Sequence, residues 1–254
     1  MVGRDTRQRT IEATARSFAI IEALRDLDGA RVTELSDELD ISKGTVYHHL
    51  STLRELGYIL KEGDEYILGL KFSNLGEYAR NRKYDYIKAR RMAEELDSQL
   101  SIDAAFIVEE NGLGVYLRSE VGEITDPNLH PQIGERMYLH TIAAGKAILV
   151  ELPQYRVEEI IDQWGLPTRT EHTITDREEL QRELDEIHKR GFAINKGESD
   201  EGVRALAVPV HKPNGQILGG ISVSGPKYRM SGEWFERELP QKIIDFVESY
   251  TSDW

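Results

Sequence analysis

A run of small polar and basic side chains between Ser42 and Arg54 has the composition of a surface that reads DNA. Val46, Leu50 and Leu53 recur at helical spacing, so a helix that begins near the start of this run would bury all three. The opposite face then carries the donors, acceptors and small side chains that contact base edges and phosphates. An ordinary solvated helix face is the alternative interpretation. The residues on this face are Lys43, Gly44, Thr45, Tyr47, His48, Ser51 and Arg54.

Two serines near the C-terminal end of the chain form a second candidate site. Ser222 and Ser224 are two residues apart in the strand-like run QILGGISVSG, residues 216–225, so both hydroxyls would lie on one face of a strand. We expect this strand next to the start of a helix, whose free N–H groups suit an anion. Two hydroxyls and backbone N–H groups would together bind a carboxylate. The alternative is that both serines simply face solvent.

Motifs for catalysis are missing from the sequence. Serine, histidine and aspartate are all present, but GISVSG places a serine where the nucleophile elbow G-x-S-x-G needs its second glycine. The seven histidines show no H-E-x-x-H spacing, and the chain has no cysteine. AAGKA lacks the glycines of a phosphate-binding loop, and no dinucleotide fingerprint is present. We therefore predict no enzymatic activity, no metal site and no cofactor.

The elements around the first candidate face predict a winged helix-turn-helix over residues 1–70. Residues 13–27 and 32–39 have helical apolar spacing, and a third helix begins at the good N-cap Ser42 and ends at Gly57. A β-hairpin then follows in GYILKEGDEYILGL, residues 57–70. A tight turn before the third helix and a hairpin after it are typical of DNA-binding winged helices, which favours the DNA-reading interpretation.

The rest of the chain predicts a linker helix over residues 71–100 and an α+β domain over residues 101–254. We expect hairpins around Asn111-Gly112 and Asn214-Gly215, which are strong turn signals. A helix over 175–190 would open with a capping box made by Thr175 and Glu178. The remaining expected elements are strands at 103–110, 114–120, 192–195, 203–211 and 216–225, a loop with Pro127 and Pro131, and helices at 141–152 and 233–250.

Composition and charge limit the class of protein. A chain of 254 residues that is 39% hydrophobic and 30% charged fits a soluble globular protein, and it has no apolar run of membrane-spanning length. The N-terminal residues lack the apolar core of a signal peptide, so we expect a cytoplasmic location and no membrane partner. A net charge of −13 disfavours DNA binding, but residues 71–91 hold seven basic residues against two acidic ones. The acidity fits either an organism with high internal salt or an ordinary acidic protein.

Five segments in order resemble one known family. TELSDELDISKGTVYHHLSTLRELGYI, followed by YILG, resembles the N-terminal winged helix of IclR-family transcriptional regulators. LHTIAAGKAIL, TITDREEL with RGFAIN, GVRALAVPV and GGISVSGP are similar, in order and spacing, to the C-terminal domain of that family. The resemblance implies a GAF-like domain that binds a small organic effector. It also implies binding to palindromic operators as a homodimer or as a dimer of dimers.

The resemblance also implies site residues. DNA contacts fall on Ser42, Lys43, Thr45, Tyr47, His48 and Arg54, with Lys61 in the wing as a phosphate contact. Many relatives carry an arginine where this chain has His48-His49, and neutral histidine attracts phosphate less strongly. The implied effector contacts are Ala143, Ala144, Gly145, Asn195, Ala205, Ser222 and Ser224.

Two of these positions depart from common relatives. Asn195 stands where several have aspartate, and Ala205 where cysteine is common, so the effector would differ from the small oxo-acids that some relatives sense. Arg204 and His140 are each either partners for an acidic ligand or structural residues.

We therefore predict a homo-oligomeric, effector-controlled regulator of metabolic genes that binds double-stranded DNA. The effector would be a carboxylate or a sugar acid, and its binding would change the placement of the two winged helices through the linker. Two alternatives stay open: an adaptor that uses its winged helix to bind a protein, and a hydrolase fused to a helix-turn-helix.

Overall fold

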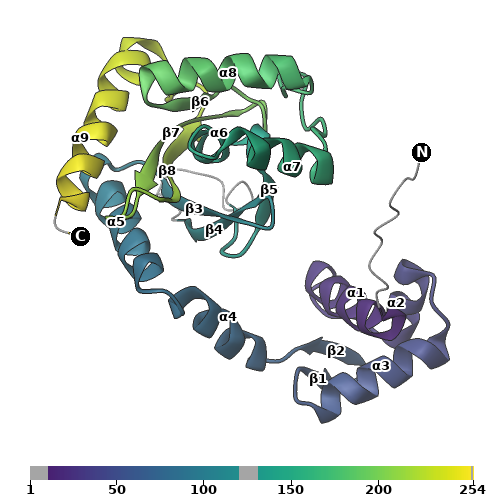
Figure 1. Cartoon of the computed structure of the whole chain (residues 1–254). Helices are drawn as coiled ribbons and strands as arrows, with labels where there is room; N and C mark the ends of the chain where they lie inside the picture. Colours follow the sequence, from purple (N-terminus) through teal and green to yellow (C-terminus); the bar gives the residue numbers. More distant parts are fainter. Residues whose placement is uncertain (1–10, 120–130, 253) are drawn as a thin grey trace. The chain divides into compact units, whose positions relative to one another are not determined.

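The computed structural model describes residues 11–119, 131–252 and 254 (Figure 1). The chain divides into two compact units, Met1–Arg80 and Asn81–Trp254, and each is described by itself. Two parts of the sequence predictions, Glu120 at the end of a strand and Pro127 in a loop, lie outside the described residues.

The first unit is a winged helix-turn-helix, as predicted. A left-handed backbone at Asp40 makes the tight turn between the second and third helices, and Gly63 has a positive φ in the hairpin turn. In sequence order the elements are α1 (Glu12–Asp26), α2 (Val32–Leu39), α3 (Lys43–Glu55), β1 (Ile59–Glu62), β2 (Glu65–Leu68) and α4 (Lys71–Asn81).

The core of this unit holds α3 against its neighbours. Leu24 of α1, Leu35 of α2 and Leu50 of α3 are almost completely buried together, and Ile59 of β1 closes the core from the hairpin side. Burial of each such side chain stabilises the unit by roughly 1.5–3 kcal/mol. The apolar stripe of α3 is therefore fixed inward, and its polar face is fixed outward.

The second unit contains an antiparallel sheet of six described strands, in the spatial order β5-β4-β3-β8-β7-β6. This mixed arrangement, together with the winged helix of the first unit, confirms the predicted α+β class. The strands are β3 (Ala104–Glu110), β4 (Leu113–Ser119), β5 (Arg136–Tyr138), β6 (Ala193–Asn195), β7 (Val203–His211) and β8 (Ile217–Pro226).

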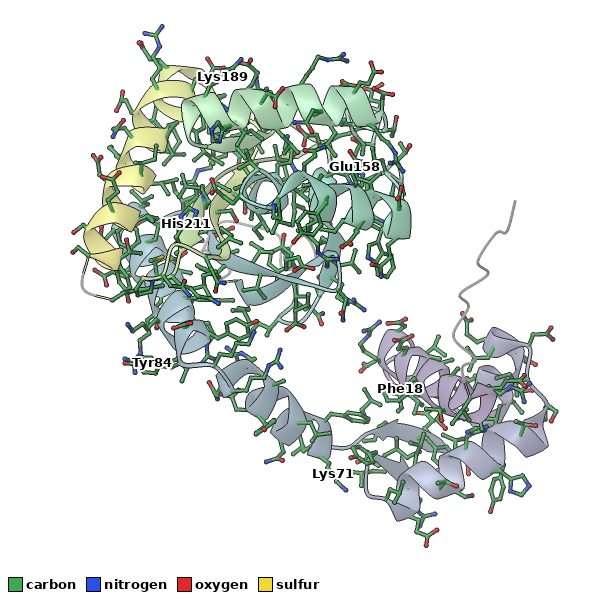
Figure 2. All side chains as sticks on the ribbon, viewed as in Figure 1. Phe18, Lys71, Tyr84, Glu158, Lys189 and His211 are labelled. Atoms are coloured by element: carbon green, nitrogen blue, oxygen red, sulfur yellow. The ribbon has the colours of Figure 1, made fainter. Side chains whose placement is uncertain are left out.

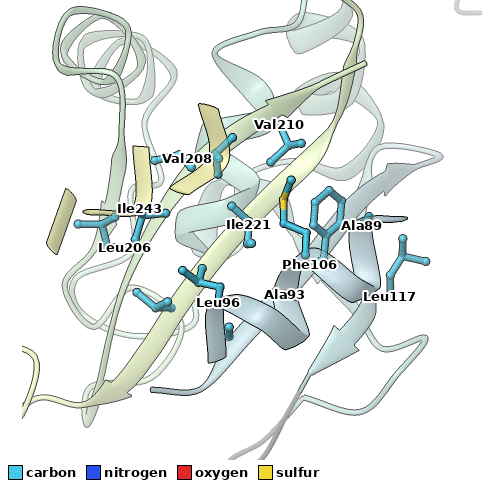
Figure 3. Close-up of a cluster of buried hydrophobic side chains, with 14 of the residues drawn as sticks. Ala89, Ala93, Leu96, Phe106, Leu117, Leu206, Val208, Val210, Ile221 and Ile243 are labelled. Atoms are coloured by element: carbon cyan, nitrogen blue, oxygen red, sulfur yellow. The ribbon is translucent and has the colours of Figure 1, made fainter. Parts of the chain in front are cut away.

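Helices pack on both faces of this sheet. One face packs against α5 (Tyr84–Leu100) and α9 (Leu239–Thr251), and Figure 3 shows Leu96, Phe106 and Ile221 in that core. The other face packs against α6 (Ala143–Leu149), α7 (Gln154–Trp164) and α8 (Arg177–Arg190). Two short helices, Leu139–Thr141 and Trp234–Glu238, precede α6 and α9. Because side chains alternate along a strand, each strand contributes one set of residues to each face.

Small residues bring α6 unusually close to its surroundings. A Cβ atom at Gly145 would lie 2.1 Å from the carbonyl oxygen of Leu139, and one at Gly220 of β8 would lie 2.8 Å from the carbonyl oxygen of Ala144. Both distances are too short for any side chain. The glycines are therefore required where the backbone of α6 meets the preceding turn and the sheet.

The predicted single linker helix over 71–100 is wrong. Arg82 and Lys83 are not helical, and Lys83 has an extended backbone at the start of α5. None of the residues of α4, all of them described, is buried, whereas α5 buries Tyr86, Ala89 and three others in the core of the second unit. Packing on the sheet determines where α5 begins, and α4 has no such constraint.

Three further differences concern helix ends. Asp176, not Thr175, caps α8, since its carboxylate accepts the N–H of Glu179 at 2.9 Å. The helix predicted at 141–152 is only the seven-residue α6. We did not predict α7, although Val157, Ile160 and Ile161 follow Pro153 at helical spacing.

Candidate functional site

The polar face of α3 is exposed as the sequence predicted. Val46, Leu50 and Leu53 are buried on its inner side, while Tyr47 is 54% exposed. The other exposed residues of the predicted face are Lys43, Gly44, His48, Ser51 and Arg54. This side of the helix presents a phenol, an imidazole and two cations to solvent, which is the set of groups that base edges and phosphates bind.

Ser42 and Thr45 both serve the start of α3. The N–H of Thr45 donates to the Ser42 hydroxyl at 3.2 Å, and the two hydroxyls are 2.9 Å apart. This is an N-cap, and it fixes the first turn, where Lys43 and Gly44 lie. A Cβ atom at Gly44 would meet no atom within 4 Å, so packing does not explain this glycine.

His48 and His49 have different surroundings. The Nδ1 atom of His49 lies 2.8 Å from the Ser17 hydroxyl, so this ring is bound to α1. His48 lies on the exposed face, with its ring centroid 6.2 Å from that of Tyr47. Only the first histidine of the pair therefore belongs to the candidate DNA surface.

The wing has a negative balance of charge. Lys61 is exposed, with its ammonium group 5.5 Å from the centroid of the Tyr66 ring. Glu62, Asp64 and Glu65 surround it and are also exposed. Because these carboxylates repel phosphate, the predicted phosphate contact of Lys61 would form in an unfavourable local field.

Many cations of the basic segment 71–91 already have partners. Lys71 donates to the carbonyl of Leu56 at 2.8 Å, which binds it to the C-terminal end of α3. Arg82 pairs with Glu110 at 2.9 Å. Lys88 lies 5.2 Å from the centroids of both Tyr84 and Trp254. These contacts give much of the segment a structural role.

Four of the predicted effector residues lie together on one face of the sheet. Asn195 pairs with Ala205, which pairs with Ser224, and Ser222 lies one row further along β8. Gly220, two residues before Ser222, contacts Ala144, so this is the face that α6 covers. Ser222 is only 7% exposed. We call the face that carries Ser222 and Ser224 the serine face.

The start of α6 lies close to the serine face. Ala143 and Ala144 are 1% exposed, and among the described residues no side chain caps the helix at Ile142. The structure therefore brings together the two parts of the predicted effector site, namely the two serines and the first turn of α6.

Asn195 has a structural role that the sequence did not predict. Its amide nitrogen donates to the Thr141 carbonyl at 2.7 Å and to the Ser199 hydroxyl at 3.1 Å. Its amide oxygen accepts the N–H groups of Gly197 and Glu198, both at 2.9 Å. Both donors and both lone pairs are thus occupied, and none is left for a ligand in this conformation.

Arg204 and His140 also have structural partners. Arg204 alternates with Ala205, so it lies on the face opposite the serines, where it donates to the Met230 carbonyl at 3.2 Å. His140 is 3% exposed, and its Nε2 atom is 3.2 Å from the Pro167 carbonyl. Burial lowers the pKa of His140, which favours the neutral ring over a cation that would pair with an acid.

Beneath the first turn of α6 lies an ion pair that sequence reasoning missed. Lys146 is fully buried, and its Nζ atom is 2.7 Å and 2.8 Å from the two carboxylate oxygens of Glu198. Glu183 of α8 lies 3.4 Å from the same ammonium group and also binds Arg190 at 3.0 Å. Burial raises the pKa of Glu198, and the charge of Lys146 opposes that rise. The signal was a lysine inside the apolar run AAGKAIL.

Comparisons with known proteins agree with this arrangement. Residues 13–63 match the family description "IclR helix-turn-helix domain", and residues 86–250 match "Bacterial transcriptional regulator IclR C-terminal". The chain belongs to the IclR family. The two matched segments correspond to the winged helix and to the α+β unit.

Several relatives of this IclR-family chain are transcriptional regulators. It is 31% identical over 241 residues to a probable HTH-type regulator, ArcR, of Halobacterium salinarum, covering 93% of this chain and 91% of that one. It is 32% identical over 231 residues to the regulator KdgR of Dickeya chrysanthemi, covering 89% and 75%. The Thermotoga maritima IclR crystal structure has the same fold, with a TM-score of 0.78, 24% identity, and coverage of 96% of this chain and 99% of that one.

These matches identify the chain as a DNA-binding transcriptional regulator and not an enzyme. Among the described helices, none is both long and apolar enough to cross a bilayer. In the described part of the chain, no group of three or more acidic or histidine side chains is placed to hold a metal ion.

The buried ion pair generates a stability prediction. Lys146→Met should lower the free energy of unfolding by about 3–5 kcal/mol, because it leaves the buried Glu198 carboxylate without its main cation. Adding Glu198→Leu should recover most of this loss. Urea denaturation of the three proteins measures both effects.

The loss in Lys146→Met should also depend on pH. A carboxylate whose folded pKa is raised favours folding below its unfolded pKa and loses that contribution as pH rises through the folded pKa. The loss should therefore be smaller at about pH 5 than at about pH 8. An equal loss at both values would show that Glu198 does not titrate as a buried group.

Proposed function

We propose that this regulator controls metabolic genes by binding palindromic operators as a homodimer or a dimer of dimers, and that a small organic acid controls its binding. The observation that carries the proposal is the exposed polar face of α3, fixed by an N-cap and a buried apolar stripe within a winged helix. The matched family description is that of bacterial regulators, whose DNA lies in the cytoplasm, so we propose a cytoplasmic location.

The proposed DNA contacts are those of α3 and the wing. Tyr47 and His48 suit base edges, and Lys43 and Arg54 suit phosphates or guanine. Ser42 and Thr45 would shape the first turn, Gly44 would let it approach the DNA backbone closely, and Lys61 would add one phosphate contact. Because the wing is acidic, we expect α3 to supply most of the affinity.

A double substitution tests the DNA contacts. Replacing Tyr47 and Arg54 by alanine should weaken binding to the promoter fragment of the regulator's own gene by more than about 1 kcal/mol, because both groups are exposed on the face that meets DNA. Fluorescence anisotropy at several salt concentrations measures the change. Arg25→Ala, which removes an exposed cation from α1, is the matched control and should have little effect.

An unchanged affinity in the double variant would refute the assignment of α3. The adaptor alternative makes a different prediction, since it expects no salt-dependent binding of the fragment by the unmodified protein.

The proposed dimer would use apolar side chains that the single chain leaves exposed. Phe18 of α1, seen in Figure 2, is 59% exposed, and on α4 Leu75 is 48% and Tyr78 74% exposed. Amphipathic helices are stable in water only when their apolar face packs on another surface. A second copy of the chain would supply that surface, and a two-fold operator requires a two-fold protein.

Charge on α4 tests this dimer. Leu75→Glu with Tyr78→Glu should shift the protein toward monomer in sedimentation velocity, because four buried carboxylates would oppose two-fold pairing. Asn74→Glu adds a charge at an exposed polar position of the same helix and serves as the control. If the double variant sediments like the unmodified protein, α4 does not form the dimer.

The proposed effector would bind between the serine face and the first turn of α6. Ser222 and Ser224 supply hydroxyls, the N–H groups of Ala143, Ala144 and Gly145 supply donors, and Ala205 leaves room beside Ser224. We assign Asn195 to positioning this site rather than to direct contact. A carboxylate or a sugar acid has the acceptors that these donors need.

Replacing Ser222 and Ser224 by alanine should abolish the response to the effector while leaving operator binding intact. A thermal-shift screen of organic acids and sugar acids first selects the acid, and anisotropy then follows its effect on the DNA complex. Ser231→Ala, an exposed serine elsewhere, is the control. A double variant that still responds normally would place the effector site elsewhere.

A further inference from the structure

The loop that follows β6, residues 196–199, is held in place by side chains. The N–H groups of Gly197 and Glu198 donate to the Asn195 amide oxygen. The hydroxyls of Thr170 and Thr173 donate, each at 2.7 Å, to the carbonyls of Gly197 and Glu198 respectively. These contacts come from neighbouring loops and the end of a strand, so the loop is able to move without unpairing the sheet.

This loop borders the serine face. It leaves β6 at Asn195, which is in the same row of the sheet as Ala205 and Ser224. Asn195 also joins the Ser199 hydroxyl and the Thr141 carbonyl, so the loop meets the chain just before α6. Ser222 is 7% exposed on the face that α6 covers, so a ligand reaches it only if α6 moves, and the loop is bound to α6 through Lys146.

Among the described residues, Lys146–Glu198 is the only charged contact between this loop and α6. A buried ion pair stabilises a protein no more than well-packed apolar side chains of similar volume do. The ion pair has a different advantage, because water solvates both charges once they separate. Two apolar side chains at these positions would instead expose hydrophobic surface when they separate. Glu183 remains 3.4 Å from Lys146, so the ammonium group keeps a partner when Glu198 leaves.

We propose that Lys146 and Glu198 form a latch that ties the 196–199 loop to α6, the helix that covers the serine face, and thereby controls access of a ligand to that face. The latch deepens the proposed function, since it rests on the serine face being the effector site. The ligands it admits are small polar acids, which gain hydrogen bonds from the serines. Lys146 and Glu198 are positioning residues and do not contact the ligand.

A single cysteine reports on access without any effector or DNA. The chain has no cysteine, so Ser222→Cys introduces one thiol, nearly isosteric with the serine, on the buried face. Its rate of reaction with dithionitrobenzoate measures how often the face opens. Adding Glu198→Gln keeps the shape of the side chain but removes its charge, and should raise this rate by about tenfold or more.

Two controls separate latch opening from general loosening. Ser231→Cys, at an exposed position, should react at the same rate with and without Glu198→Gln. Arg177→Ala breaks an exposed ion pair with Asp162 and should leave the reaction of Ser222→Cys unchanged. If Glu198→Gln changes the Ser222→Cys rate by less than about twofold, the latch is refuted.

A second variant applies if Glu198→Gln does not fold. Lys146→Met with Glu198→Leu replaces the latch with apolar side chains, so lifting the loop would expose hydrophobic surface, and the thiol should react at least about threefold more slowly. An unchanged or faster rate overturns the proposal. Because no effector is present, these results are independent of whether Ser222→Ala with Ser224→Ala abolishes the effector response.

Discussion

The close approach of α6 to the sheet is the constraint on which the second unit depends. The backbone of this short helix lies against the Leu139 carbonyl and against β8, and only glycine fits at Gly145 and Gly220. This spacing leaves no room for a large side chain at the first turn, so Ala143 and Ala144 are small for reasons of packing. The same spacing brings the start of α6 close to Ser222 and places Lys146 in the interior, where it needs a carboxylate. Packing and the proposed ligand site therefore share one set of residues.

The two units solve different electrostatic problems. In the first, an acidic chain has to bind a polyanion, and the wing makes this harder because Glu62, Asp64 and Glu65 outnumber Lys61. In the proposed DNA complex, affinity would then depend on the cations of α3 and on contacts that do not need charge, such as those of Tyr47. In the second unit, the Lys146 ammonium group is buried away from water. Glu198 compensates its charge, although the Glu198 carboxylate loses its own hydration in doing so. In the roles proposed above, exposed charge serves DNA recognition in one unit, and buried charge serves positioning in the other.

Periodicity explains how much of the fold could be predicted from the sequence. Val46, Leu50 and Leu53 define the buried side of α3 by their spacing, and the strand period of two places Ser222 and Ser224 on the same face. Contacts between distant residues carry no such local signal. The partners Lys146 and Glu198 are 52 positions apart, and the loop that Asn195 holds exists only once β6 has paired with β7. For the same reason the break before α5 was not predictable, because packing on a sheet, and not the local sequence, sets its start.

The interruption at Arg82 and Lys83 makes the chain modular. No residue between Lys71 and Lys83 belongs to a hydrophobic core, and the boundary between the compact units falls in the same short segment. A recombination event there would join a winged helix from one regulator to the ligand-binding unit of another without cutting through either core. Residues added or lost at this position would change the length of chain between the winged helix and the α+β unit while both units still folded. The segment is thus a natural place for regulators of this architecture to acquire new pairings of operator and signal.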